Sequence, residues 1–547
     1  RKIANMIRLK LAEEHRGLKQ RPPWLQQTIS AGNPCAFAQL PEYSVPHGLP
    51  EQTNSSRPAT DAGCDDPEHE FARHRWGFLL ESLLAPNTPD RADLEQVQRW
   101  IETHRNQTGP AWETYSACER VSNLLLYISV RHIAPGSAIE KLLAEFIAGS
   151  LEWIGSHLEY YGNLQTNNHI INNARALVMG GAAIGNRPAY EAGQGLLRAS
   201  LPNMVLSGGF LRERSSHYQL IVLGWVLDAW KFTTMAEGAQ SPAAGFLTRY
   251  VNDMAQAARL LCDANGHLLA SIGDVSPDIT PLNSTRRLAT LYAHIWPLAR
   301  PAAAIEIRDG WFRCETGASL VLGNFPAGSH PLPYPTHGHA DYSSFIWRQG
   351  NTDVLIDTGR YRYTADAVST LQVSARGHNL PLVNGFAPLC ETLLSGGLWW
   401  PQPYASSTLN VASQERTVVL EHDGFSRATP VARHVRELTL SDSDLLVVDR
   451  FEGQGTVDLQ LCWNFGPSFT TFDAEHLTAR GALGKITLAV EGPSGPPTLA
   501  YIAGAAPGAW SSPEYGKLTP SLGILLGWRV SLPARLATRF ALQPCAA

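Results

Sequence analysis

The sequence lacks the features that mark membrane and nucleic-acid-binding proteins. No apolar run approaches the ~20 residues that cross a bilayer, so we expect a soluble chain without a membrane span. Neither sign of charge predominates, because 44 lysine and arginine residues stand against 49 aspartate and glutamate residues, a net charge of −5 without long runs of one sign. This balance argues against a nucleic-acid partner. An anionic ligand must therefore meet a local group of basic residues.

Closely spaced cysteines are also missing. The 8 cysteines lie far apart and form no C-x-x-C pair, which argues against a zinc knuckle or a thioredoxin-like redox site. No signal segment is visible at the beginning of the sequence. We suspect a periplasmic or secreted protein, while a cytoplasmic location stays open. The sequence does not indicate an oligomeric state.

The length of 547 residues favours more than one folding unit. Up to about residue 300, apolar residues recur at the helical period of 3.6 residues. Candidate helices include residues 168–185, 189–206, 216–236, 241–264 and 284–296. Residues of the helix-breaking type, such as Pro135-Gly136 and Pro202, are expected in the connections. Successive amphipathic helices can bury their apolar stripes only against one another, so they predict stacked helical hairpins in an arc or toroid.

After Pro297 and Pro301 the pattern changes to short alternating runs, such as 319–322, 417–420 and 444–448. Such runs, separated by Gly, Asp, Ser and Pro, are typical of an antiparallel β-sandwich. We therefore predict an α+β multidomain protein. Its expected parts are an N-terminal wrapping segment 1–70, an (α/α) toroid domain 71–300 and an antiparallel β-sandwich domain 301–547.

Polar side chains cluster at the start of one predicted helix, as Asn167, Asn168, His169, Asn172 and Asn173. Amides at a helix N-terminus can be ordinary caps. So many polar groups within one and a half turns exceed what capping requires. We expect some of them to face a ligand.

A second cluster places Arg212 and Arg214 shortly before Tyr218. Two arginines can hold a carboxylate or a sulfate, and a tyrosine in their positive field has its phenolate favoured, as a proton-removing tyrosine requires. The alternative is a salt-bridged helix entrance in which Tyr218 packs as an ordinary aromatic residue.

Two further clusters contain His337, His339, Asp357 and His378. Histidines two residues apart on a strand point to one face, and a carboxylate with a third imidazole would complete a ligand set suited to zinc or a similar divalent ion. The alternative is that backbone groups satisfy these side chains.

Taken in order, these clusters resemble the heparinase II/III superfamily of polysaccharide lyases, which join an (α/α) toroid to an antiparallel β-sandwich. The matching pieces are Asn167-Asn168-His169 with Asn173, Glu213-Arg214-Ser215-Ser216-His217-Tyr218, Ile272-Gly273-Asp274, His337-Gly338-His339-Ala340-Asp341, Asp357-Thr358-Gly359, and His378-Asn379 with Val383-Asn384-Gly385.

The resemblance implies β-elimination on a polysaccharide that contains uronic acid. A proton beside a carboxylate is very weakly acidic, so the carboxylate must be neutralised before a base can act. By resemblance, Asn168 and His169 would hold that group and Tyr218 would transfer protons. His337 would act as the base or stabilise the carboxylate, depending on the configuration of the uronate.

The resemblance also implies binding residues. The expected substrate contacts are Asn167, Asn173, Arg212, Arg214, Tyr363 and Arg376. His339, Asp357 and His378 would hold a divalent ion, zinc or manganese, in a structural role. Gln219 stands where some relatives carry a histidine, so no titrating role is expected there.

Three classes of function remain open on the sequence. The first is a lyase acting on a glycosaminoglycan such as heparan sulfate, chondroitin or hyaluronan, with an alginate-type polyuronate as the rival substrate. The second is a toroid glycoside hydrolase, which needs two carboxylic acids, with Glu213, Asp274 and Asp341 as candidates. The third is a glycan-binding protein without turnover.

Overall fold

The computed structural model divides the chain into two compact units. Unit 1 comprises Arg1–Arg212, Gln219–Gln256 and Pro277–Leu298, and unit 2 comprises Glu213–Tyr218, Ala257–Ser276 and Ala299–Ala547. The structure describes residues 22, 25, 28–32, 34, 36–43, 66–84, 90–162, 166–296, 304–326, 337–388, 391–394, 398–401, 407–412, 416–492, 495–502 and 509–544. Most of the predicted wrapping segment 1–70 lies outside the described residues, and the predicted boundaries at 70 and 300 stay predictions.

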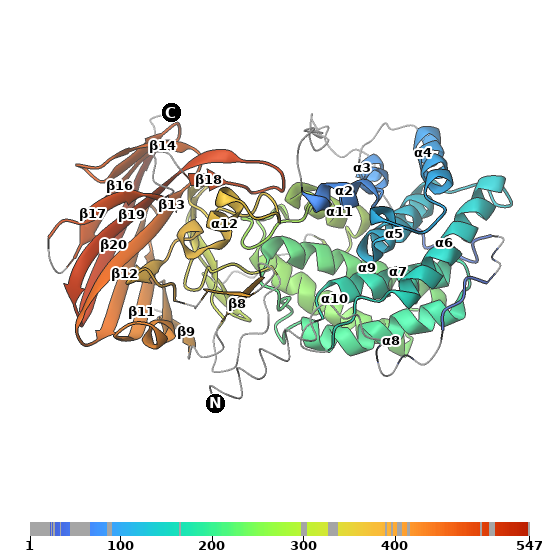
Figure 1. The fold of residues 1–547 in the computed structure, drawn as a ribbon, viewed down its shortest axis with the longest axis horizontal. Coiled ribbons are helices and arrows are strands. Elements are labelled where there is room, and N and C mark those ends of the chain that lie inside the picture. Colours follow the sequence, from blue (N-terminus) through green and yellow to red (C-terminus); the bar gives the residue numbers. More distant parts are fainter. Residues whose placement is uncertain are drawn as a thin grey trace. The chain divides into compact units, whose positions relative to one another are not determined.

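Unit 1 is built from helices, drawn from blue to green in Figure 1. The helices are α2 (Pro67–Arg73), α3 (Gly77–Leu84), α4 (Asp90–Thr103), α5 (Thr114–Arg131), α6 (Ala138–Ser156), α7 (His169–Ala183), α8 (Arg187–Met204), α9 (Ser216–Glu237), α10 (Pro242–Leu260) and α11 (Pro281–Leu291). Neighbours along the chain pack together: α5 contacts α6 and α7, and α7 contacts α6 and α8. The predicted break at Pro202 is wrong, because α8 continues to Met204. The proline removes the one hydrogen bond that an N–H at position 202 would donate to the Arg198 carbonyl, and the ladder continues past it, since the Val205 N–H donates to the Leu201 carbonyl at 2.9 Å.

A buried carboxylate joins several helices of unit 1. Asp228 on α9 accepts hydrogen bonds from Arg175 Nε at 2.7 Å, from Arg287 and from the Tyr292 hydroxyl at 2.5 Å. Arg175 also pairs with Glu119 on α5, at 2.9 Å. A buried charge is tolerated only when it is paired and hydrogen-bonded, so these contacts hold α5, α7, α9 and α11 in one arrangement.

Unit 2 contains two antiparallel sheets, with strands drawn mostly in yellow to red in Figure 1. The first has the order β1-β2-β3-β4-β5-β13-β19-β17, with β6 beside β13 and β18 beside β19. The second has the order β14-β15-β16-β20-β12-β11-β10-β9, and β7 and β8 form a separate hairpin.

The strands of unit 2 have the following bounds, given in sequence order. They are β1 (Ile305–Arg308), β2 (Trp311–Thr316), β3 (Ser319–Asn324), β4 (Ile346–Gln349), β5 (Thr352–Leu355), β6 (Pro381–Val383), β7 (Glu391–Leu394), β8 (Leu398–Pro401), β9 (Ser407–Ala412), β10 (Thr417–His422), β11 (Val431–Leu440), β12 (Asp444–Gly453), β13 (Thr456–Phe465), β14 (Phe469–Asp473), β15 (Thr478–Gly481), β16 (Gly484–Glu491), β17 (Thr498–Tyr501), β18 (Ala509–Ser511), β19 (Thr519–Ser531) and β20 (Ala534–Pro544), with α12 (Ala367–Val373) between β5 and β6.

The two sheets share one apolar core. Trp463 on β13 of the first sheet meets Phe540 on β20 of the second, with ring centroids 4.9 Å apart. Along β13, Val457 and Leu459 are buried while Asp458 between them is exposed, the alternation of a strand with one face in a core. Burying each such side chain stabilises the fold by about 1.5–3 kcal/mol. The predicted order of a helical toroid followed by an antiparallel β-sandwich is confirmed.

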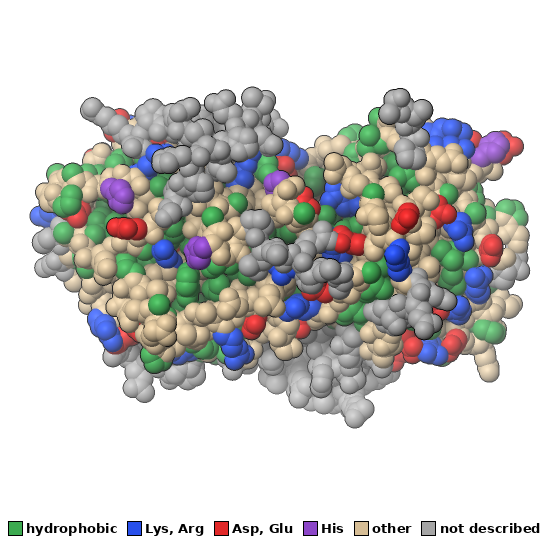
Figure 2. Space-filling model, turned by 180° about the vertical axis from the view of Figure 1, so that it is seen from behind, with side chains coloured by type: hydrophobic (Ala, Val, Ile, Leu, Met, Phe, Trp, Pro, Cys, Tyr) green, Lys and Arg blue, Asp and Glu red, His purple; other side chains and the backbone are tan. Residues whose placement is uncertain are grey.

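The described surface carries charges of both signs. On the face shown in Figure 2, lysine and arginine side chains alternate with acidic ones over both the helices and the sheets. Among the described helices, none combines the length and the apolar character that a membrane crossing demands.

Candidate active site and metal centre

Tyr218 is fixed by hydrogen bonds at the first turn of α9. The Ser215 hydroxyl accepts the Tyr218 backbone N–H at 3.0 Å, as an N-capping serine does, and donates to the Asp274 carbonyl at 2.7 Å. The Ser216 backbone N–H donates to the Ile272 carbonyl at 3.0 Å. The helix start therefore lies against the segment 272–274.

Gly273 permits a third segment to join these two. Its φ of +77° lies in the left-handed region, and a Cβ there would lie 2.6 Å from the His337 carbonyl oxygen and 2.8 Å from that of Arg214. The next residue, Asp274, donates its backbone N–H to the same His337 carbonyl at 2.9 Å. Only glycine fits both the backbone angle and the space.

This arrangement brings the predicted residues Tyr218, His337 and Tyr363 together in unit 2. The Tyr218 and His337 rings are stacked, with centroids 3.6 Å apart and an interplanar angle of 8°. The Tyr218 and Tyr363 hydroxyl oxygens are 2.9 Å apart, and the Tyr363 hydroxyl also reaches the Val275 carbonyl at 3.3 Å. Burial, and after it the charge of a Tyr218 phenolate, raises the pKa of Tyr363 well above its usual value. Tyr363 therefore keeps its proton and can donate to Tyr218.

Asp274 is the carboxylate of this group. Its oxygens contact His337 Nδ1 at 3.1 Å, His339 Nε2 at 2.9 Å and Arg360 Nη1 at 3.0 Å. Burial alone would raise the pKa of Asp274, but Arg360 and the two imidazoles outweigh it and hold the pKa far below the usual range. The side chain is ionised at neutral pH. Glu213, fully buried, lies 3.7 Å from the other nitrogen of His337, Nε2.

The predicted anion-binding arginines differ in what they contact. Arg214 pairs with Asp341 at 2.5 Å and donates to Asn324 at 2.8 Å, and Arg212 donates to the Thr166 carbonyl in unit 1. Both side chains are buried, and these contacts engage part of each guanidinium group inside the protein. Arg376 is exposed. A substrate contact at each of the three stays a prediction.

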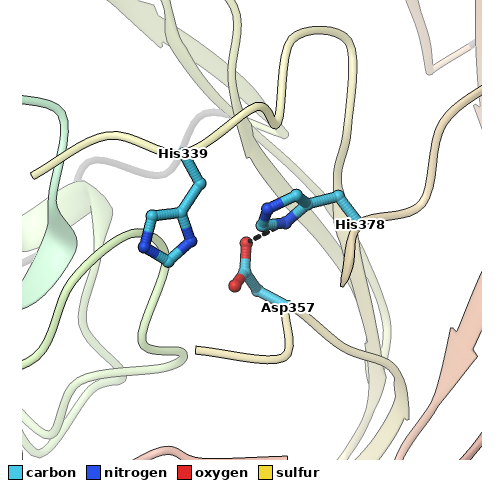
Figure 3. A group of neighbouring side chains, drawn as sticks. All are labelled: His339, Asp357 and His378. Atoms are coloured by element: carbon cyan, nitrogen blue, oxygen red, sulfur yellow. Dashed lines mark hydrogen bonds and ion pairs between the residues drawn. The ribbon is translucent and has the colours of Figure 1, made fainter. Parts of the chain in front are cut away.

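His339, Asp357 and His378 lie together in unit 2, as Figure 3 shows. Their potential ligand atoms all lie within 4.8 Å of one another, and His378 Nδ1 contacts Asp357 Oδ2 at 3.0 Å. His339 Nδ1 is buried and has no hydrogen-bond partner among the described residues. Two imidazoles and one carboxylate are the donors that zinc and similar ions accept, so this set fits a metal ion.

The expectation that His337 and His339 lie on a strand is wrong. They belong to the irregular segment between β3 and β4, and their rings face one side because both reach Asp274. The spacing in the sequence was compatible with a strand, but His337 and Asp274 exchange backbone and side-chain bonds that replace a sheet ladder.

Unit 1 brings the predicted residues His169 and Asn173 together. They lie four residues apart on one face of α7, and both contact the Glu159 carboxylate, His169 Nδ1 at 2.8 Å and Asn173 Nδ2 at 3.0 Å. The Asn173 side-chain oxygen accepts the Glu159 backbone N–H at 2.8 Å. About one third of the His169 side chain is exposed (34%).

The capping interpretation holds for one asparagine of this cluster. The Asn167 side-chain oxygen accepts the His169 backbone N–H at 3.1 Å. Asn168, which directly precedes α7 and is fully buried, makes no capping hydrogen bond. Asn172 accepts from Arg175 and belongs to the buried charge network. Capping therefore does not account for Asn168.

Two residues that matter here were not predicted from the sequence in their roles. Glu159 lies in no sequence motif, and nothing in the sequence predicts its contact with His169. Asp274 stood in the Ile272-Gly273-Asp274 piece, but its contacts depend on residues 63 and 65 positions away. Gln219 bonds through both ends of its amide to backbone groups of Leu211, Gly209 and Met254.

Residues 302–537 match the family of heparinase II/III-like C-terminal domains. The matched region belongs to that family. The predicted resemblance to the heparinase II/III superfamily is thereby confirmed. No curated protein matches the sequence.

Solved structures of two polysaccharide-cleaving enzymes share the fold of this chain. The crystal structure of heparinase III has a TM-score of 0.65 and 14% identity, over 90% of this chain and 80% of that chain. A mutant of the heparan sulfate lyase from Pedobacter heparinus has a TM-score of 0.58 and 13% identity, over 100% of this chain and 89% of that chain. The likeness extends over both units.

Proposed function

We propose that the protein is a polysaccharide lyase that cleaves an anionic polysaccharide containing uronic acid by β-elimination. The observation that carries this proposal is the Tyr218 phenol, hydrogen-bonded to Tyr363 and stacked on His337. A phenol beside an oriented imidazole is suited to moving protons at a carbon centre. The family of the matched region and the fold of the solved lyases support the same reaction class.

In the proposed reaction the C5 proton passes to a base, the C4–oxygen bond breaks, and its electron pair leaves with the oxygen, which takes up a proton. The electrons of the C5–hydrogen bond form the new C4–C5 double bond. Asn168 and His169 hold the uronate carboxyl group and neutralise its charge. Tyr218 gives and takes protons, alone when the C5 proton and the leaving oxygen lie on one side, and together with His337 when they lie on opposite sides.

Hydrolysis is the weaker alternative, because its candidate carboxyl groups are already engaged. Asp274 accepts from three donors and Asp341 pairs with Arg214. Glu213 is fully buried beside His337. A general acid for glycoside hydrolysis must instead carry a proton toward the leaving oxygen.

The proposed substrate is a glycosaminoglycan such as heparan sulfate, chondroitin or hyaluronan, with alginate as the rival. The test is to incubate the protein with each polymer, with divalent ions present, and to follow the ultraviolet absorbance of the unsaturated uronate. The masses of the products separate elimination from hydrolysis, since only hydrolysis adds water. Absence of the absorbance with all four polymers would contradict the proposal, and binding without cleavage would favour a glycan-binding protein.

The proposed cofactor is one divalent ion, zinc or manganese, held by His339, Asp357 and His378. When bound, the ion would cross-link the three chain segments that carry its ligands, as structural ions do. Elemental analysis should find about one ion per wild-type chain and a loss in a His339→Ala variant. A wild-type protein that holds no ion and is stable in chelator would contradict this part.

A further inference from the structure

One buried carboxylate connects the proposed proton-transferring group with the proposed metal site. Asp274 Oδ2 contacts His337 Nδ1 at 3.1 Å, and Asp274 Oδ1 contacts both His339 Nε2 at 2.9 Å and Arg360 Nη1 at 3.0 Å. Asp274 is 2% exposed. Its three side-chain partners come from the loop after β3 and the segment after β5.

These contacts determine which ring nitrogens carry hydrogen. A carboxylate only accepts hydrogen bonds and a guanidinium only donates, so His337 Nδ1 and His339 Nε2 must both be protonated. In a neutral imidazole the remaining nitrogen then holds the lone pair. That nitrogen is Nε2 in His337 and Nδ1 in His339. The latter is the buried atom that has no hydrogen-bond partner among the described residues.

The backbone prevents Asp274 from moving away from these rings. Its N–H donates to the His337 carbonyl at 2.9 Å, and its carbonyl accepts from the Ser215 hydroxyl at 2.7 Å. Gly273, directly before it, lies too close to the His337 and Arg214 carbonyls for any side chain. The carboxylate is therefore held against both imidazoles from one side, and Ser215 fixes it relative to the turn that carries Tyr218.

We propose that Asp274 is a positioning residue that sets the tautomers of His337 and His339 together, leaving His337 Nε2 for proton transfer and His339 Nδ1 for the metal ion. The part of this proposal that concerns His337 and proton transfer rests on the proposed function. A carboxylate behind a metal-binding histidine typically changes metal affinity by 10–100-fold when it is removed. Here the same carboxylate also orients the imidazole stacked on Tyr218.

The test compares two substitutions of this residue. Asp274→Ala removes both acceptors, so zinc or manganese affinity, measured by competition with a chelator, and kcat should both fall, with a smaller change in KM. Asp274→Asn is nearly isosteric, but its amide offers one accepting oxygen, so at least one of the two quantities should fall. Circular dichroism and thermal unfolding identify the variants that fold.

Arg360→Gln is the matched control for charge. It removes the third partner of Asp274 and leaves the hydrogen bonds to both imidazoles, so metal affinity should stay unchanged. If loss of affinity reflected only a change of charge in the site, the removal of Arg360 should instead raise it.

The outcomes that overturn the proposal are distinct from failure of the lyase assignment. A folded Asp274→Asn variant that keeps both quantities, a folded Asp274→Ala variant that loses only one, or a wild type that binds neither ion would each overturn it. If wild type cleaves no polysaccharide, the lyase assignment fails, and the affinity of the Asp274 variants for the ion still decides whether Asp274 orients His339.

Discussion

At the scale of single residues, the proposed turnover depends on the hydroxyl of Tyr218. Tyr218→Phe keeps a ring that can stack on His337 and removes only the oxygen bonded to Tyr363. Because general acid–base catalysis contributes about 10²–10⁴-fold, we expect kcat to fall by that factor with little change in KM. Steady-state kinetics by ultraviolet absorbance measures both constants.

Tyr501→Phe provides the matched control for this substitution. Tyr501 lies on β17 of the same unit, and no hydrogen bond of its hydroxyl occurs within the part of the chain that the structure describes. Its removal should leave kcat unchanged. A folded Tyr218→Phe variant with the kcat of wild type would exclude Tyr218 as the proton-transferring group.

Glu159 is the residue whose loss should weaken the proposed contact of His169 with the uronate carboxyl group. Glu159→Gln replaces the charged acceptor of His169 Nδ1 and of Asn173 with a neutral amide. Hydrogen bonds to charged groups contribute about 1.5–3 kcal/mol, so kcat/KM should fall roughly 10–100-fold. Glu152→Gln, on the exposed face of α6, is the control and should retain kcat/KM. Equal kcat/KM values in both variants would remove His169 from the proposed site.

At the scale of helices and strands, local sequence patterns predict most of the long regular elements. The apolar period predicted a helix over 216–236 and the structure has α9 over Ser216–Glu237, because the period of 3.6 depends only on neighbours along the chain. The run 444–448 likewise begins β12. Residue type alone predicts a break at Pro202, whereas α8 tolerates the loss of this one backbone donor.

The candidate site was predictable only as a set of residue types. Tyr218 and His337 were found through a resemblance that runs along the sequence, and nothing in that order specifies that their rings stack. The contact between Asp274 and His337 joins positions 63 residues apart and requires the left-handed backbone of Gly273. Such pairing arises from tertiary structure, which no local pattern encodes.

Three neighbouring strands of the second sheet carry a row of buried, hydrogen-bonded polar side chains. His422 on β10 lies opposite His434 on β11, and their ring nitrogens Nε2 and Nδ1 are 2.9 Å apart. His434 Nε2 contacts Asp449 on β12 at 2.8 Å, and Arg436 binds the same carboxylate with two nitrogens. The Gly424 backbone N–H donates to His422 Nδ1, so both rings can be satisfied while neutral.

The two buried histidines predict a loss of stability in acid. Burial, and then the neighbouring His434, lowers the pKa of His422 well below its usual value, and burial lowers the pKa of His434. An unfolded histidine has a pKa of about 6.5, so below that pH the unfolded chain binds protons that the native chain does not. Each histidine should then reduce the free energy of unfolding by about 1.4 kcal/mol per pH unit as the pH falls toward its native pKa.

The slope is measurable by urea unfolding at several values between pH 5 and pH 7. His422→Gln can keep hydrogen bonds to its neighbours and removes one titrating ring, so the curve should become less steep than that of wild type. His476→Gln is the control, because His476 is exposed (68%), and its curve should remain parallel to that of wild type. An unchanged slope in the His422 variant would exclude this histidine as a source of acid sensitivity.

At the scale of the whole molecule, the proposed ion links binding to folding. An ion that binds only the native chain stabilises it by about 2.7 kcal/mol at one hundred times its dissociation constant. Its three ligands all lie in unit 2, between positions 339 and 378. Hydrogen exchange followed by mass spectrometry should therefore show faster exchange after chelation in peptides of this segment.

Peptides from α6 in unit 1, which carries none of these ligands, should keep their exchange rates when the ion is removed. His378→Ala should show the faster exchange from the start and no further response to chelator, whereas His476→Ala should respond as wild type does. Because an ion acts by mass action, adding it back should restore the slow exchange in wild type. It should not restore slow exchange in His378→Ala. If chelator changes unit 1 and unit 2 equally, or changes His378→Ala as much as wild type, the ion does not bind at His339, Asp357 and His378.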